Sequence, residues 1–206
     1  MGTVVDTVVL HYFLLVEEYE LLLHVLEPPV GVPRIVYDPE EGESADAGAS
    51  ELRRNIRYEE RIARTSQVGA ERQAALQRVQ RLEAIDPLGG DAVQVFDMTD
   101  SELELFGRLT AEQPDDQLGL VAPLGAGEAA CVAIALERSH VMATDVTDAL
   151  RTLHRLRPNH PYERIRRLLM RAGEEGGISQ DRANQIHQRM RDVGFWDSVA
   201  PFPDGQ

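Results

Sequence analysis

Lysine is missing altogether from this chain, whose 21 basic residues are all arginine. A nucleotide-binding P-loop needs a lysine on the phosphates, and Schiff-base or pyridoxal enzymes need a lysine amine. Both enzyme classes are therefore excluded. Whether the preference for arginine reflects function or a GC-rich genome stays open at this point.

Cysteine is almost as scarce, since Cys131 is the only one and lies in an apolar stretch. A single cysteine can form neither a disulfide within the chain nor a cysteine-based zinc site, so we expect a small core residue. The chain also lacks a long apolar run with a basic leader, because residues 8–16 follow Asp6 and are succeeded by Glu17 and Glu18. We therefore expect no signal peptide, no membrane span and a cytoplasmic protein.

Acidic residues are abundant, and the formal net charge is -14. Residues 1–136 carry 10 arginines against 25 acids, whereas residues 151–191 carry 10 arginines against 4 acids. The whole chain is too acidic for a general nucleic-acid coat protein, but its basic C-terminal part could still hold a polyanion on one face.

A single α/β domain is predicted from the length of 206 residues, the 43% hydrophobic content and the alternation of short apolar runs with helical patterns. We expect a parallel sheet of about four or five strands with helices on both faces, a charged helical insertion at 51–85 and a helical C-terminus. The domain should cover residues 1–198, with a flexible tail at 199–206. The expected strands are 3–5, 32–37, 92–97 and 140–144. The expected helices are 8–26, two meeting near Gly69, Thr99 to Leu109, 128–138, 146–156, 162–172 and 180–193. The helix that begins at Thr99 should open with a capping box of Thr99 and Glu102.

Three acids stand beside the predicted strands. Asp6 and Asp145 each end a strand, and Glu128 opens a helix. Ligands of open α/β sheets bind beyond the carboxyl ends of the strands, so these carboxylates could share one cleft, where they would repel unless a cation joined them. Oxygen ligands suit Mg²⁺ or Mn²⁺, and phosphodiester hydrolysis is the natural reaction class. Each acid also has a simpler interpretation, as a helix cap or a first-turn carboxylate.

Three motifs in this order resemble those of PIN-domain nucleases, including ribonuclease toxins of the VapC type: V-V-D-T at 4–7, L-G-A-G-E-A-A-C-V-A-I-A-L at 124–136 and V-M-A-T-D-V-T-D-A-L at 141–150. The segment 178–196 also resembles the C-terminal helix of a subgroup of predicted PIN proteins. The resemblance spans nearly the whole chain. Its most specific part is the Gly-Glu-Ala helix followed by a strand that ends in Thr-Asp.

The resemblance implies a set of site residues. Asp6, Glu128 and Asp145 would hold the metal, and Asp148 would be an optional fourth acid. A further acid is expected after the second strand, where three neighbouring positions stay open. The hydroxyl neighbours that orient the carboxylates or contact phosphate would be Thr7 and Thr144, and the open positions are Asp38, Glu40 and Glu41.

The chain departs from a small member of this family in two places. The segment 51–85 is longer and more charged than the minimal fold needs, which suggests an insertion that binds a partner or gates the substrate. No last strand is visible between Pro158 and Tyr162, which suggests either four strands or a very short edge strand.

A basic helical face is predicted near the C-terminus, because Arg164, Arg167 and Arg171 share one side of a helix. Arginine forks bind phosphates bidentately, so this face could position RNA beside the metal. The alternative is a solvated face paired with Glu163 and Glu174.

The leading hypothesis is a metal-dependent ribonuclease, the toxin of a toxin–antitoxin pair, with an antitoxin protein as partner and a homodimer as a further expectation. The second hypothesis is a non-catalytic interaction scaffold with the same fold, suggested by the charged segment 51–85. A haloacid-dehalogenase-type phosphatase is a weak third, since that chemistry expects a second aspartate where this chain has Val8.

Overall fold

Five parallel strands form the centre of the molecule. The computed structural model describes residues 2–26, 28–38, 49–85, 93–113, 118, 122–175 and 177–197. The strands pair in the order β3-β2-β1-β4-β5, and every pair is parallel. Their bounds are β1 Thr3–Val5, β2 Val30–Pro33, β3 Gln94–Phe96, β4 Val141–Ala143 and β5 Tyr162–Glu163.

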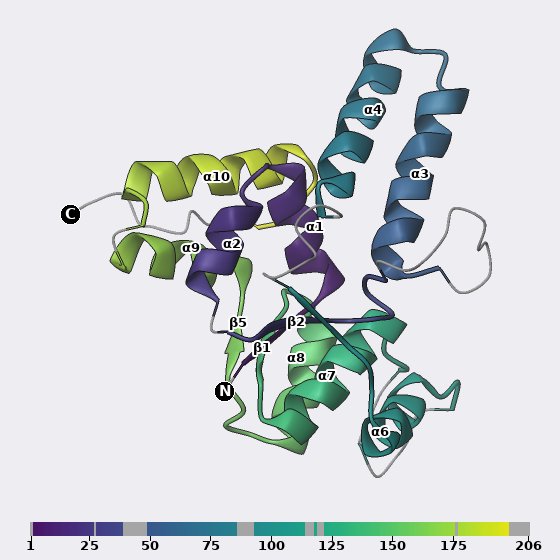
Figure 1. Cartoon of the computed structure of the whole chain (residues 1–206), viewed down its shortest axis with the longest axis vertical. Coiled ribbons are helices and arrows are strands. Elements are labelled where there is room, and N and C mark those ends of the chain that lie inside the picture. The colour runs from purple at the N-terminus through teal and green to yellow at the C-terminus, as the bar shows by residue number, and fades with distance from the viewer. Residues whose placement is uncertain are drawn as a thin grey trace.

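Helices cover both faces of this sheet, which confirms the predicted α/β class. Figure 1 shows α6, α7 and α8 on one side of the sheet and α1, α2, α9 and α10 on the other, with α3 and α4 extending away as a hairpin. The helices are α1 Thr7–Leu15, α2 Tyr19–Val25, α3 Glu51–Thr65, α4 Gly69–Glu83, α6 Asp100–Thr110, α7 Ala126–Arg138, α8 Thr147–Leu156, α9 Ile165–Glu174 and α10 Gln180–Asp192.

The core lies on both sides of β1, the central strand. Val4 and Val5 are at most 1% exposed, and α7 is apolar nearly all round because it packs against the sheet on one side and against α6 and α8 on the others. Cys131 of α7 is buried, as its sequence context predicted. The core cluster runs through the chain as far as Phe195, whereas the predicted tail 199–206 lies outside the described residues.

One predicted helix is in fact two. The expected helix over 8–26 breaks at Glu17, which has a positive φ of 59°. The break is stabilised because distant arginines donate hydrogen bonds to the carbonyls at the end of α1. Arg81 donates to the Leu15 carbonyl at 3.0 Å, and Arg189 donates to the Val16 carbonyl at 2.9 Å. These partners come from α4 and α10, so the local sequence could not show them.

The second strand lies earlier than predicted. β2 is Val30–Pro33, not 32–37, because its register sets Val30 beside Thr3 and Gly31 beside Val4. The chain then turns, with the Val36 amide donating to the Pro33 carbonyl at 2.8 Å. Val36 is buried in this turn, and its burial explains why an apolar run continues past the strand.

The last strand exists but is only two residues long. Tyr162 and Glu163 pair with Met142 and Ala143 of β4, so the expected helix 162–172 begins only at Ile165. The sheet therefore has five strands, the larger of the two numbers expected. Two residues are too few to show a strand period in the sequence.

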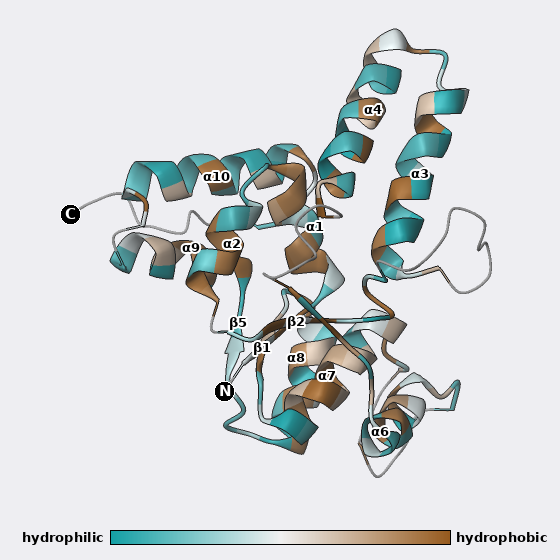
Figure 2. Cartoon of the chain, in the orientation of Figure 1, coloured by the Kyte–Doolittle hydropathy of each residue, from teal (hydrophilic) through white to brown (hydrophobic). Residues whose placement is uncertain are grey.

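The hairpin of α3 and α4 is the most separate part of the fold. The two helices meet near Gly69, as predicted, and Arg78 of α4 pairs with Glu59 of α3 at 2.8 Å. Leu52 and Leu82 are fully buried at its base, while Figure 2 shows mainly hydrophilic residues along the rest of the hairpin. We call the segment 51–83 the arm.

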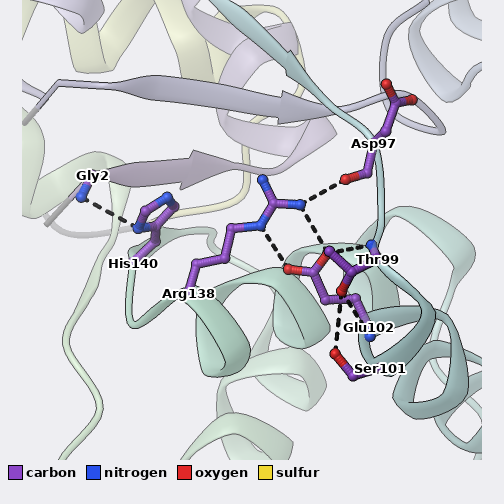
Figure 3. Close-up of polar contacts among 7 residues, drawn as sticks. All are labelled: Gly2, Asp97, Thr99, Ser101, Glu102, Arg138 and His140. Atoms are coloured by element: carbon purple, nitrogen blue, oxygen red, sulfur yellow. Dashed lines mark hydrogen bonds and ion pairs between the residues drawn. The ribbon is translucent and has the colours of Figure 1, made fainter.

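A polar cluster ties α6 to the C-terminal end of α7 (Figure 3). Arg138 donates to both carboxylate oxygens of Glu102, at 2.6 and 2.8 Å, and to the Asp97 carbonyl at 2.6 Å. Glu102 also accepts from the Thr99 amide, which completes the predicted capping box. Glu102 is 1% exposed, so this ion pair is buried and structural.

Within the described ranges, the structure has no helix that is both long and apolar enough to span a bilayer.

Candidate metal centre

Asp6 occupies the position immediately after the central strand. Its backbone amide donates to the Ala143 carbonyl of β4 at 3.0 Å, which continues the pairing of β1 one residue beyond the strand. Its side chain is the N-cap of α1, and Oδ1 accepts from the Thr7 amide at 2.7 Å. The carboxylate thus lies at the carboxyl edge of the sheet, where α/β folds bind ligands.

The second oxygen of Asp6 has a partner on the neighbouring strand end. Thr144 donates its hydroxyl to Asp6 Oδ2 at 2.7 Å, and Thr144 itself is fully buried. Thr144 also accepts from the Val146 amide at 3.1 Å, so its hydroxyl has a fixed orientation. The predicted role of Thr144 as a hydroxyl neighbour that orients a carboxylate matches this contact.

Glu51 is a site residue that the sequence analysis did not single out. It is the first residue of α3, and Oε1 accepts from the Gly127 amide at 2.8 Å, while Oε2 accepts from the Thr7 hydroxyl. A Cβ on Gly127 would lie 2.2 Å from Glu51 Oε2, so only glycine leaves room for this approach. The sequence held one signal, an acid at the start of a predicted helix after an acidic stretch of sequence.

Glu128 lies in the first turn of α7, as predicted. It is half-buried, and its Oε2 accepts from the Gly125 amide at 3.3 Å, which closes the helix N-terminus. The capping interpretation and the site interpretation are therefore compatible, since the same side chain faces the cleft that contains Asp6 and Glu51.

These three carboxylates share one cleft of about 320 Å³. The remaining polar side chains on its wall come from α1 and α3. The lining residues are Asp6, Thr7, Val8, Glu51, Arg54, Asn55, Glu128 and Val146.

Burial and repulsion between the carboxylates both raise pKa values in the cleft. Burial raises the pKa of Asp6 to about 7, the Thr144 hydrogen bond opposes this shift, and the charges of Glu51 and Glu128 add to it. Burial also raises the pKa of Glu128, and Glu51 and Asp148 raise it further. The cleft therefore brings together acids of which Asp6 and Glu128 hold their protons to a higher pH than usual.

Asp145 lies apart from this group. Its Oδ2 accepts from the Ile165 amide at 2.8 Å, so it closes the start of α9 rather than that of α8. Burial raises its pKa, the nearby Arg164 lowers it and Asp197 raises it. Asp145 thus lies two residues past the end of β4 at Ala143, and in this arrangement its carboxylate faces α9.

The other predicted acids occupy three different places. Asp148 is exposed at the start of α8 and pairs with Arg151 at 3.1 Å, although its charge still reaches Glu128. Asp38 pairs with Arg34 at 2.8 Å in a separate cleft beside β3. The positions 40 and 41 lie outside the described residues.

The predicted basic face near α9 is largely paired. Arg171 contacts Glu163 at 3.1 Å, and Arg167 contacts Glu174 at 3.2 Å. Arg164 precedes the first turn of α9. These pairs are the ones that the solvated-face alternative expects, and RNA binding by this face stays a prediction.

The donor set of the cleft has the chemistry for a hard divalent cation. Asp6, Glu51 and Glu128 offer only oxygen ligands, as Mg²⁺ and Mn²⁺ prefer. As the side chains stand, no three His, Cys, Asp or Glu residues of the described ranges are grouped to hold a metal ion. The Glu51 oxygens are held by Thr7 and Gly127, so joining the carboxylates around a cation requires side-chain rotation.

Comparison with protein-family models, with curated proteins and with solved structures gives no match for this chain.

Proposed function

We propose that this protein is a metal-dependent ribonuclease with a PIN-like fold. The observation that carries the proposal is Asp6: a carboxylate that is 2% exposed, beside Glu51 and Glu128, at the edge of a parallel sheet. A buried acid among other acids is unfavourable for folding and is typical of a functional site. The strand order and the three motifs support the PIN-like assignment.

The carboxylates of the cleft would bind the metal, and the neighbouring hydroxyls orient them. Asp6, Glu51 and Glu128 would hold Mg²⁺ or Mn²⁺, which when bound neutralises phosphate charge and lowers the pKa of a coordinated water. Thr144 and Thr7 hold the carboxylates of Asp6 and Glu51 in place through their hydroxyls. Asp145 and Asp148 stay predicted acids of the same edge.

The biological setting is part of the proposal. An unrestrained ribonuclease damages its own cell, so an antitoxin protein that blocks it is expected, as in toxin–antitoxin pairs. A cytoplasmic location and a homodimeric assembly stay predictions from the sequence.

A non-catalytic scaffold is the second candidate, and the arm favours it. The arm exposes large apolar side chains, with Tyr58 at 53%, Val68 at 60% and Leu76 at 46%. Exposed apolar side chains on a protruding element are typical of protein contacts. Such a scaffold would gain little thermal stability from Mn²⁺. The proposed enzyme would gain more stability the more tightly it binds the ion.

Cleavage of a mixed panel of single-stranded and structured RNAs tests the proposal, with Mg²⁺, Mn²⁺ or a chelator. Asp6→Asn removes the charge and retains acceptor capacity for Thr7, and Asp100→Asn on the exposed start of α6 serves as the matched control. We expect cutting that needs metal, disappears in Asp6→Asn and persists in Asp100→Asn. Cutting by Asp6→Asn at the wild-type rate would refute the assignment, and an inactive wild type that metal does not stabilise would favour the scaffold.

A further inference from the structure

The arm carries positive charge in a strongly acidic protein. Residues 51–83 contain 8 arginines and 5 glutamates, a net charge of +3, whereas the whole chain has -14. The arm is therefore the part of the molecule near the cleft that attracts a polyanion rather than repelling it.

One face of α3 presents this charge together with an aromatic ring. Arg54, Tyr58 and Arg61 follow one another at intervals of four and three residues, so they lie on the same side of the helix. All three are exposed, and the Arg61 guanidinium lies 5.3 Å from the centre of the Tyr58 ring. We call these three residues the α3 strip.

Two arginines of α3 outside the strip have partners within the protein. Arg64 pairs with Glu60 at 3.2 Å, and Arg53 lies 5.8 Å from the centre of the Tyr37 ring. In contrast, Arg61 pairs with no carboxylate of the described residues. Among the described residues, the guanidinium of Arg54 contacts one carboxylate, that of Glu51, at the long distance of 3.7 Å.

The strip leads directly into the carboxylate cleft. Arg54 lines the cleft, and so does Asn55 on the same turn. Glu51 begins the helix in the cleft, and Tyr58 follows about 10 Å further along the helix axis. A strand bound along this face would thus reach the cleft that Asp6 and Glu128 line together with Arg54.

We propose that the α3 strip binds single-stranded RNA and directs it into the cleft, an inference that rests on the proposed ribonuclease function. Tyr58 stacks on one unpaired base, and Arg54 and Arg61 contact the phosphates on either side. Paired bases in a duplex do not offer their faces to a side chain, so the strip selects unpaired RNA. Charge complementarity and continuity with the cleft identify RNA as the occupant of this surface.

Binding is measured first, without cleavage. The full-length protein is titrated in chelator into a fluorescein-labelled single-stranded oligoribonucleotide, and anisotropy gives the Kd. We expect Tyr58→Ala to weaken binding by about tenfold and Tyr58→Phe to restore it, because stacking needs the ring and not the hydroxyl. Arg61→Gln should lower the slope of log K against log salt by about 0.7, the value for one phosphate contact in a single strand.

The control is Arg72→Gln, which removes one exposed arginine from α4 of the same arm. It should leave the Kd unchanged, and all variants should melt at the wild-type temperature because the replaced side chains are exposed. A blunt-ended RNA duplex should bind less tightly than the single strand and respond to none of the strip variants. Equal losses in Arg61→Gln and Arg72→Gln would overturn the proposal, since they would report net charge alone.

Turnover separates this inference from the ribonuclease proposal. With Mn²⁺, Tyr58→Ala should raise KM for single-stranded RNA and leave kcat unchanged. If the wild type cleaves RNA and both Tyr58→Ala and Arg61→Gln keep the wild-type Kd and KM, RNA binding by the strip is refuted and the ribonuclease proposal is not. The exposed strip would then be a candidate surface for a protein partner. Tyr58-dependent binding by a protein that cuts no RNA would uphold the strip and refute the enzyme.

Discussion

Thr144 joins the ends of two adjacent strands by donating its hydroxyl to Asp6 Oδ2 at 2.7 Å. Thr144 comes directly after β4, and Asp6 comes directly after β1, so 138 residues of chain separate two atoms in hydrogen-bond contact. The contact holds a buried carboxylate that also lies near the acids Glu51 and Glu128. Variants of the two residues separate the geometry of this contact from its charge.

Thr144→Val keeps the shape of the side chain and removes the hydroxyl. Because hydrogen bonds to charged groups contribute about 1.5–3 kcal/mol, we expect roughly 2 kcal/mol lower stability at pH 8, where Asp6 is ionised. The loss should be smaller at pH 5, and Thr144→Ser should restore the wild-type value. Urea unfolding at both pH values measures these differences; an equal loss at pH 5 and pH 8 would mean that the contact does not depend on the Asp6 charge.

Asp6→Asn removes the titration of this site. Burial, Glu51 and Glu128 raise the pKa of Asp6 from 3.8 to about 7, so between these values the folded protein keeps a proton that the unfolded chain has lost. Wild-type stability should therefore fall, relative to Asp6→Asn, as the pH rises from about 4 to about 7, by an amount on the order of a few kcal/mol.

Chelator must be present in this measurement, because bound cation would favour the ionised carboxylates. Melting curves of both proteins across this pH range give the difference. A constant difference from pH 4 to pH 8 would contradict the raised pKa.

Gly127→Ala displaces one ligand of the proposed centre. The new Cβ would overlap Glu51 Oε2, at 2.2 Å, and that carboxylate is the flexible end of a side chain. We expect stability to change little, because alanine favours a helix over glycine by about 1 kcal/mol while the shift of Glu51 opposes this gain. The rise in melting temperature on adding Mn²⁺ should shrink. A full wild-type rise would mean that Glu51 does not hold the metal.

Asp145 can be tested for charge and for capping separately. Asp145→Ala should lower stability by about 1 kcal/mol because the Ile165 amide loses its acceptor, whereas Asp145→Asn keeps an acceptor oxygen. Any cleavage defect of Asp145→Asn then reports the missing charge. Since this carboxylate faces α9, we expect a smaller defect than for Asp6→Asn. Equal defects in RNA cleavage rate would establish Asp145 as a full member of the metal centre.

Arg138→Ala should strongly destabilise the protein. It leaves Glu102, which is 1% exposed, without its cationic partner, and breaking a buried pair costs about 3 kcal/mol. Burial opposes ionisation of Glu102, but the hydrogen bonds from Arg138 and the Thr99 amide outweigh it, so the pKa of Glu102 is lowered. The contribution is therefore present above its ordinary pKa of 4.5 and is lost as the pH falls. Arg151→Ala, in a fully exposed pair, is the control for urea unfolding and should change little.

The sequence predicted those parts of the fold that local signals specify. The capping box of Thr99 and Glu102, the two helices that meet near Gly69 and the short strand before Asp6 all depend on residues within a few positions of each other. The parallel sheet with helices on both faces followed from the alternation of short apolar runs with helical patterns, although the number of strands stayed open between four and five.

The remaining features depend on partners far along the chain. The break at Glu17 depends on Arg81 and Arg189, and β5 is a strand only because β4 pairs with it. Glu51 lies in the cleft because the Thr7 hydroxyl and the Gly127 amide donate to its carboxylate there, across 44 and 76 residues of sequence. No local pattern carries such information, so the position of Asp6 at the edge of the sheet was predictable and the full set of acids in its cleft was not.

The arm is rooted in the proposed centre, because Glu51 is the first residue of α3. The arm is thus part of the cleft as well as an extension of the domain. A chain from which the arm is deleted would lose one of the three cleft carboxylates together with the proposed RNA-binding strip. Loss of activity in such a deletion would not show which of the two was needed. Single substitutions at Tyr58 or Arg61 leave Glu51 in place at the start of α3, so they report on the proposed RNA contact alone.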